Sequence, residues 1–167
     1  MRSKNVSVMV EGALMVALAF GLHFIKVFQA PYGGSVTLGG MVPLILFAFR
    51  HGTGAGVTAG AAYGLLDLVV NPYVVHPAQL ILDYPLAYGL VGLAGLFRKN
   101  VVAGAFVGIF GRFVASFLSG VIFFAAYAKG NVYAYSALYN AGYLVPEFII
   151  AVTVLLVLRR TSIMRDR

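Results

Sequence analysis

The chain has 167 residues, of which 61% are hydrophobic and 10% charged, with a mean hydropathy of +0.93. A soluble domain has roughly 25% charged residues, so this composition excludes a soluble protein and predicts an integral membrane protein. The net charge of +7 does not indicate a nucleic-acid partner, because the basic residues lie at the ends of apolar segments rather than on one solvated face. The absence of cysteine excludes disulfides and thiol chemistry.

The expected fold is an all-α membrane protein, a compact bundle of six transmembrane helices embedded in lipid. Each span needs about 20 residues, so six spans use nearly all of residues 1–167 and predict a single domain with no soluble part. The first apolar run lacks a signal-type cleavage site and is expected to be retained. Strands are not expected, because the apolar runs lack the alternation of a membrane barrel. In chain order the predicted spans are Val6–Val27, Leu38–Phe49, Thr53–Val70, Ala78–Phe97, Val101–Ala128 and Ala134–Leu158.

Basic residues mark alternate gaps between these spans. Most of the twelve Lys and Arg residues fall in blocks at Arg2/Lys4, Arg50, Arg98/Lys99, Arg159/Arg160 and Arg165/Arg167. Cytoplasmic loops carry an excess of Lys and Arg, and the gaps between the blocks hold only Lys26 and Lys129. The pattern therefore predicts that both termini lie inside the cell.

The second span is short, and its start is expected to be irregular. It follows an uncharged outer connection, Phe28–Thr37, that contains Pro31 and two adjacent glycines, Gly33 and Gly34. Within the span, a further glycine pair and Pro43 weaken a regular helix.

Small residues recur at four-residue spacing on two spans. Gly56, Gly60 and Gly64 form one stripe, and Ala13, Ala17 and Gly21 form the other. Such stripes let helix backbones approach closely in lipid. Internal packing is the expected role of the glycine stripe, whereas packing and a docking face for another membrane protein both fit the alanine stripe.

Polar residues form stripes on three otherwise apolar spans. An ionisable group inside a span costs about 2.5–3.5 kcal/mol on insertion scales and is a functional candidate by default. Lipid cannot satisfy polar groups, so the stripes should face one another or a wet cavity. The stripes are Gln79 and Asp83; Arg112, Ser116 and Ser119; and Ser136, Asn140, Tyr143 and Glu147.

Depth divides these residues into two groups. Arg112 and Glu147 fall near mid-membrane and are expected to form an internal ion pair that either orients helices or carries function. Asp83 and Asn140 lie in the outer half, where aromatic residues crowd. An interfacial aromatic belt explains some of these rings, but a belt has no use for a buried carboxylate. Rings beside a carboxylate suit a small aromatic cation, because the rings stack on flat heterocycles and attract cations. The aromatic residues are Tyr84, Phe123, Phe124, Tyr127, Tyr133, Tyr135 and Tyr139.

Other polar residues give weaker indications. Asp67 is expected to reach the outer interface, and Glu11 to snorkel or cap at the inner one. His23 and His76 each stand alone, without the partner spacing of a metal site. The glycine-rich segment 52–56 lacks the Gly-Lys-Ser/Thr ending of a phosphate loop. No catalytic constellation, metal site or cofactor is expected, and the chain is not expected to be an enzyme.

Several motifs resemble the ThiT (YuaJ-type) family of thiamine transporters, in order along nearly the whole chain. They are Pro31–Thr37, Met41–Pro43, Phe49–Gly52, His76–Tyr84, Ser119–Phe124 and Tyr135–Asn140. The His-Pro-x-Gln-x-x-x-Asp-Tyr and Tyr-Ser-x-x-Tyr-Asn stretches are the specific ones. The resemblance implies the substrate-binding S component of an energy-coupling factor importer in a prokaryotic plasma membrane. Such a protein works with a transmembrane T component and two cytoplasmic ATPases.

The resemblance also implies residue roles. The family's acidic-Tyr pair corresponds to Asp83 and Tyr84, and its span 6 residues to Tyr135 and Asn140. Its span 5 aromatic corresponds to Phe124. With Gln79, Ser116 and Tyr139 added, these eight residues form the predicted thiamine site. The family's docking stripe for the T component corresponds to Ala13 and Ala17.

Three positions depart from the family pattern. Gly34 stands where some members have Trp, Leu38 where some have Glu, and Ser116 where some have His. Part of the pocket must therefore be built differently. The expected ligand is thiamine with fewer ring contacts, and the alternatives within this class are a related pyrimidine and another vitamin. Alternatives outside this class are a small membrane enzyme or structural subunit built around Arg112 and Glu147, and a self-sufficient proton-coupled carrier.

Overall fold

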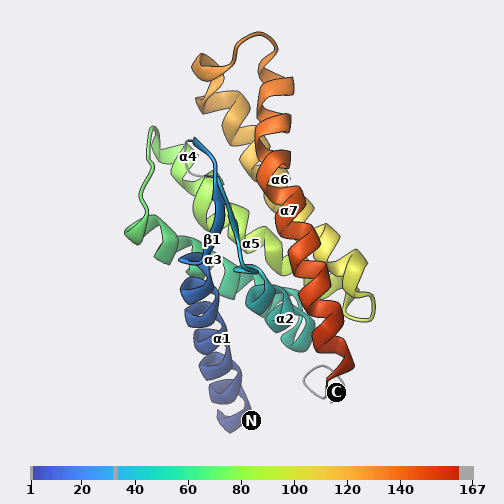
Figure 1. The fold of residues 1–167 in the computed structure, drawn as a ribbon. Helices are drawn as coiled ribbons and strands as arrows, with labels where there is room; N and C mark the ends of the chain where they lie inside the picture. The colour runs from blue at the N-terminus through green and yellow to red at the C-terminus, as the bar shows by residue number, and fades with distance from the viewer. Residues whose placement is uncertain (1, 32–33, 162–167) are drawn as a thin grey trace.

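The computed structural model describes residues 2–31 and 34–161, with side chains from residue 5 onward. Its helices form one bundle, with a small two-stranded hairpin beside them (Figure 1). The helices are α1 (Arg2–His23), α2 (Val42–His51), α3 (Thr53–Val70), α4 (Pro77–Ile81), α5 (Ala87–Val91), α6 (Val101–Phe123) and α7 (Val132–Arg160). The strands are β1 (Lys26–Gln29) and β2 (Ser35–Thr37).

The predicted bundle of six transmembrane helices is confirmed. Within the described residues, five helical segments are long and apolar enough to span a membrane: Asn5–His23, Thr53–Val70, Pro77–Phe97, Val101–Phe123 and Val132–Arg160. The sixth is the short apolar helix α2, only 10 residues long. Figure 1 places the start of α1 and the end of α7 at the same end of the bundle, as an even number of crossings requires.

The hairpin corrects the expectation that the chain has no strands. Helix α1 ends at His23, short of the predicted Val27, and the chain continues as antiparallel strands that pair Phe28 with Val36 and Gln29 with Ser35. Backbone at membrane depth is tolerated outside a helix only where protein or a cavity covers it. That condition holds for β2, because it packs against α7 and its Val36 and Thr37 are buried.

Helix α2 begins later than predicted, at Val42 rather than Leu38. The cause is the turn at Gly39, whose φ of 84° favours glycine, followed by a Val42 amide that donates to the Gly39 carbonyl. Pro43 lies in the first turn of α2, where its missing N–H costs nothing. At about 1.5 Å per residue α2 is only about 15 Å long, and residues 42–49 are all buried. It therefore forms the centre of the bundle rather than a lipid-facing span.

The fourth span, predicted as Ala78–Phe97, is not a regular helix. Between α4 and α5 lies a π-helical turn at Leu82–Leu86, and α5 continues into a 3-10 helix at Gly92–Phe97. Pro85 sits inside the π turn. Proline has no N–H to donate and its ring crowds the preceding turn, so the backbone widens there. This widened turn carries both Asp83 and Tyr84.

The glycine stripe on α3 packs inside the bundle, as expected. A Cβ on Gly56 would lie 3.1 Å from the Gly92 Cα, and one on Gly60 would lie 2.8 Å from the Tyr88 carbonyl carbon. A Cβ on Gly64 would lie 2.6 Å from the Tyr84 carbonyl carbon. The stripe therefore lets α3 touch the backbone of the irregular fourth span and fixes the position of the π turn.

The end of α6 and the start of α7 differ from the predicted boundaries. Helix α6 ends at Phe123 instead of Ala128, and α7 begins at Val132 instead of Ala134. The start of α7 is fixed by Asn131, whose Oδ1 accepts hydrogen bonds from the Tyr133 and Ala134 amides. Figure 1 shows the α6–α7 connection, α4 and the far end of the hairpin at the end of the bundle opposite the termini.

Candidate functional site

A cavity of about 390 Å³ lies among α4, the π turn, α6, α7 and the hairpin. Its volume falls in the range of about 300–1,000 Å³ that is usual for small-molecule pockets. All eight residues predicted for the substrate site line it: Gln79, Asp83, Tyr84, Ser116, Phe124, Tyr135, Tyr139 and Asn140. Residues from three helical spans thus meet at one hollow.

Asp83 is held in place by two side chains. Its Oδ2 accepts a hydrogen bond of 2.7 Å from Gln79 Nε2 and another of 2.7 Å from Ser119 Oγ. Both bonds use the same oxygen, and no described residue makes a hydrogen bond to Oδ1. A partly buried carboxylate with one oxygen fixed and one available suits a ligand that carries positive charge or N–H donors.

Gln79 positions both Asp83 and the loop of residues 71–76, which connects α3 to α4. Its side chain is buried, with 1% exposed. Its Oε1 accepts from the Val75 amide at 3.0 Å, and its Nε2 donates to the Tyr73 carbonyl at 3.1 Å as well as to Asp83. The amide can make few further bonds, so Gln79 shapes the site through Asp83 and the loop rather than by reaching a ligand.

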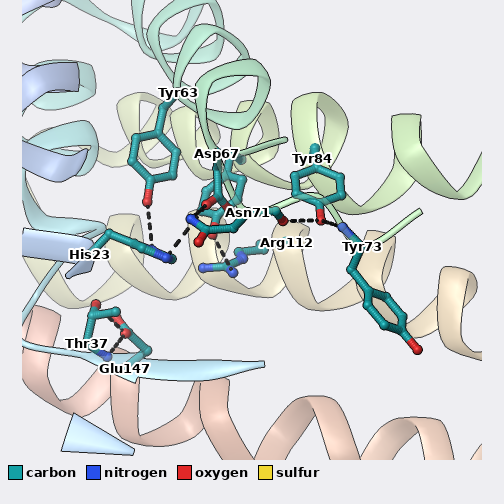
Figure 2. Close-up of polar contacts among 10 residues, drawn as sticks. His23, Thr37, Tyr63, Asp67, Asn71, Tyr73, Tyr84, Arg112 and Glu147 are labelled. Atoms are coloured by element: carbon teal, nitrogen blue, oxygen red, sulfur yellow. Dashed lines mark hydrogen bonds and ion pairs between the residues drawn. The ribbon is translucent and has the colours of Figure 1, made fainter. Parts of the chain in front are cut away.

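Tyr84 fastens the same loop from the π turn. Its hydroxyl donates to the Asn71 carbonyl at 2.9 Å and accepts from the Tyr73 amide at 2.8 Å (Figure 2). The loop in turn brings the Tyr73 ring to 5.9 Å from the Phe124 ring, with the planes only 19° apart. These parallel rings form one aromatic wall of the cavity. Tyr73 was not among the predicted site residues, because nothing in the sequence shows that its loop folds back over α6.

Asn140 belongs to a polar network on α7. Its Nδ2 donates to the Ser136 carbonyl at 2.9 Å, and its Oδ1 accepts from the Tyr143 hydroxyl at 2.7 Å. Ser136 Oγ donates to the Phe117 carbonyl on α6 at 2.8 Å. The network joins α6 to α7 along the cavity, as the stripe of polar residues at i, i+4 and i+7 predicts.

The hairpin connection is tied to the cavity by Tyr139. The Tyr139 hydroxyl accepts from the Gly34 amide at 3.1 Å and donates to the Pro31 carbonyl. Gly34 is buried, and a Cβ there would lie 2.7 Å from the Tyr143 ring and 3.0 Å from the Tyr139 hydroxyl. The absence of a side chain at Gly34 therefore lets the backbone of this residue lie directly on these two rings. The Tyr135 ring stacks on Tyr139 at 6.3 Å.

A second carboxylate lines the cavity, and the interpretation of Asp67 as an interfacial residue is wrong. Asp67 is 6% exposed; it lies 3.6 Å from His23 Nε2 and accepts from Asn71 Nδ2 at 3.0 Å. His23 is not alone either, since its Nδ1 lies 3.1 Å from the Tyr63 hydroxyl (Figure 2). The signal was present: Asp67 continues the buried stripe of α3, three residues after Gly64.

The expected ion pair between Arg112 and Glu147 does not form. Arg112 donates to the Tyr88 hydroxyl at 3.0 Å and to Met41 Sδ at 3.2 Å, with its guanidinium 4.1 Å from the centre of the Tyr88 ring. Glu147 Oε1 instead accepts from the amide and the hydroxyl of Thr37, the latter at 2.6 Å. The prediction failed because it took no account of β2, which lies against α7 and supplies its own donors to the carboxylate.

Comparison with known proteins decides the family. The sequence model described as "Thiamine transporter protein (Thia_YuaJ)" matches residues 9–165. The chain belongs to this thiamine transporter family. The thiamine transporter ThiT of Bacillus subtilis (strain 168) is 36% identical, over 96% of this chain and 94% of the relative. ThiT of Lacticaseibacillus paracasei (strain ATCC 334) is 35% identical, over 83% of this chain and 80% of the relative.

Two solved structures share the fold. ThiT from Listeria monocytogenes superposes with a TM-score of 0.86 at 25% identity, covering 96% of this chain and 98% of that one. A structure described as the S component of a bacterial ECF transporter gives a TM-score of 0.65 at 21% identity, covering 98% of this chain and 99% of that one. The chain therefore has the fold of these two structures along nearly its whole length.

Within this family fold, the remaining predicted positions lie as follows. Ala13 and Ala17 are exposed on α1, so their stripe does not pack inside the bundle. Leu38 is 53% exposed and does not line the cavity. Glu11, expected to snorkel or cap, pairs instead with Arg50 at 2.7 Å and His51 at 2.9 Å, which ties α1 to α2.

Proposed function

We propose that the protein is the thiamine-binding S component of an energy-coupling factor importer. The observation that carries this proposal is the meeting of Asp83, held by Gln79 and Ser119, with aromatic side chains around one cavity. Thiamine combines a fixed thiazolium charge with a flat aminopyrimidine. A carboxylate balances the charge, and tyrosine and phenylalanine rings stack on the heterocycles.

The residues around the cavity have distinct roles in this proposal. Asp83 supplies negative charge and accepts hydrogen bonds, and Asp67 adds a second carboxylate to the same cavity. Phe124, Tyr135 and Tyr139 supply ring contacts, with Tyr84 at the π turn. Ser116 on α6 and Asn140 on α7 make the polar side of the cavity between the rings. No other ligand or cofactor is needed for binding.

Transport itself requires partners. The chain has no phosphate-binding loop, so we assign ATP hydrolysis to two separate cytoplasmic ATPases and coupling to a transmembrane T component. The positive-inside pattern supports an orientation with both termini in the cytoplasm of a prokaryotic cell and the cavity toward the outside. The exposed stripe with Ala13 and Ala17 is the surface we assign to the T component.

Competition binding tests the ligand. The chain has no Trp and ten Tyr, so quenching of tyrosine fluorescence in detergent is the readout. Thiamine should quench saturably at one site and should compete more strongly than its bare hydroxymethylpyrimidine. Tighter binding of the pyrimidine would assign the site to that compound. Gly34 would then explain the preference, because it supplies no ring contact where some family members have Trp. The absence of saturable binding by any of these ligands would exclude the proposal.

Reconstitution tests the transport role. Vesicles that contain the protein alone should not accumulate labelled thiamine. Vesicles that also contain the T component and the ATPases should do so only with ATP inside. Accumulation driven by a proton gradient in the absence of ATPases would identify a self-sufficient carrier and contradict the proposed role.

Removing the Tyr139 hydroxyl should speed the release of thiamine. Tyr139→Phe loses the bonds to Gly34 and Pro31 that fasten the hairpin connection, each worth about 0.5–1.5 kcal/mol. We expect dissociation roughly three- to tenfold faster in stopped-flow fluorescence. Tyr133→Phe is the matched control, because Tyr133 is 64% exposed on the same helix. Equal release rates for wild type and Tyr139→Phe would show that these bonds do not retain the ligand.

A further inference from the structure

Three buried side-chain polar atoms have no hydrogen-bond partner among the described residues, and one of them, Glu11 Oε1, is ion-paired with Arg50 at 2.7 Å. Two are left with neither kind of partner. They are Glu147 Oε2 on α7 and Arg112 Nε on α6. The Glu147 side chain is 2% exposed, and its other oxygen is occupied by Thr37. A buried polar atom left unpaired costs about 1–3 kcal/mol, and more when the group is charged. Both atoms therefore call for a ligand.

The two residues line the same small cavity. This second cavity has a volume of about 10 Å³ and lies under the hairpin, with Thr37, Gly40, Tyr63 and Tyr88 among its other lining residues. A volume of about 10–15 Å³ is what one water molecule needs, provided that two to four polar partners surround it. Arg112 Nε can donate to such a water and Glu147 Oε2 can accept from it.

We propose that Arg112 and Glu147 share one buried water in this cavity, and that this water-bridged pair fastens β2 to α6. Glu147 holds the Thr37 amide and hydroxyl (Figure 2). The proposed water links Glu147 to Arg112. Arg112 in turn is fixed on Tyr88 and Met41. The charges that the sequence pairs directly are thus paired through water, which offsets the cost of burying each of them.

The link reaches from the hairpin to the ligand cavity. Arg112 and Tyr88 line the large cavity as well as the small one, whereas Glu147 lines only the small one. Glu147 is therefore a positioning residue that acts through β2. Resting on the proposed function, the inference extends to ligand retention: a looser β2 frees the connection at Gly34 and lets the ligand leave sooner.

Amide hydrogen exchange without ligand tests the link separately from thiamine binding. Arg112→Lys keeps the charge but removes Nε. Since Arg112 donates no hydrogen bond to β2 itself, a bridging water predicts that exchange of the Thr37 amide rises about fivefold in this variant. Thr153→Val is the control, because Thr153 is exposed on α7, and it should leave the exchange rate of the Thr37 amide unchanged. Unchanged Thr37 exchange in Arg112→Lys would overturn the proposal.

A crystal structure of the wild-type protein tests the same point if Arg112→Lys does not fold. Density for one water within hydrogen-bond distance of both Arg112 Nε and Glu147 Oε2 is expected. Direct contact between the two side chains, or a cavity without water, would overturn the bridge.

Ligand kinetics test the retention step. Glu147→Gln should raise the thiamine dissociation rate about three- to fivefold and leave the association rate unchanged. Faster Thr37 exchange with unchanged dissociation would refute retention but keep the bridge. Failure of the wild type to bind thiamine would refute the proposed function and leave the exchange result standing.

Discussion

Asp83→Asn should weaken thiamine binding by about 30-fold or more. The substitution keeps the size of the side chain but removes the negative charge that we propose balances the thiazolium, at a partly buried position. Truncating one partner of a buried charge pair costs about 2–5 kcal/mol, and each 1.4 kcal/mol is about tenfold in Kd. Titration of the purified protein with thiamine, followed by tyrosine fluorescence, measures the change.

The control for Asp83→Asn is another acid-to-amide change far from the cavity. Glu11 lies near the opposite end of the bundle, bound to Arg50 and His51, and does not line the cavity. Glu11→Gln should therefore bind thiamine like the wild type. If Asp83→Asn kept wild-type affinity, the carboxylate could not be the counter-charge, and the assignment of the cavity to a cationic ligand would lose its main support.

Gly64→Ala should destabilise the fold and damage the site together. A Cβ at Gly64 would lie 2.6 Å from the Tyr84 carbonyl carbon and 2.9 Å from the Pro85 Cα. Backbone cannot rotate away as a side chain can, so α3 and the π turn must move apart, at a cost of about 1–3 kcal/mol. Because the π turn carries Asp83 and Tyr84, we expect roughly tenfold weaker thiamine binding and a melting temperature lower by several degrees.

Gly54→Ala is the matched control on the same helix. A Cβ at Gly54 meets nothing within 4 Å, and alanine favours a helix over glycine by about 0.5–1 kcal/mol. Its melting temperature should stay level or rise slightly. Equal melting temperatures for Gly54→Ala and Gly64→Ala would contradict the close contact between α3 and the π turn. A destabilised Gly64→Ala with full affinity would show that the turn does not position the site.

The fold was largely predictable because a membrane restricts what a chain can do. Long apolar runs and the placement of Lys and Arg identify the helical spans directly. The hairpin at Lys26–Thr37 was not predictable in this way. Its strands β1 and β2 pair with each other and β2 packs on α7, and neither leaves a periodic signal in so short a segment. The break in the fourth span was visible only as Pro85.

The cavity and its lining were predictable for a related reason. Polar residues in spans must turn inward, so stripes on three helices indicated a common cavity, and all eight predicted residues line it. Asp67 was missed because its place near a span end looked like an interface. Arg112 and Glu147 were paired wrongly because their similar depth cannot show that Thr37 donates hydrogen bonds to Glu147.

A crystal structure of the protein grown with thiamine examines the proposed site most directly. One thiamine molecule should occupy the 390 Å³ cavity, with its positive ring facing Asp83 and its rings stacked against the aromatic walls. Thiamine bound elsewhere, or bound in the cavity without any contact to Asp83, would show that this carboxylate does not select the ligand.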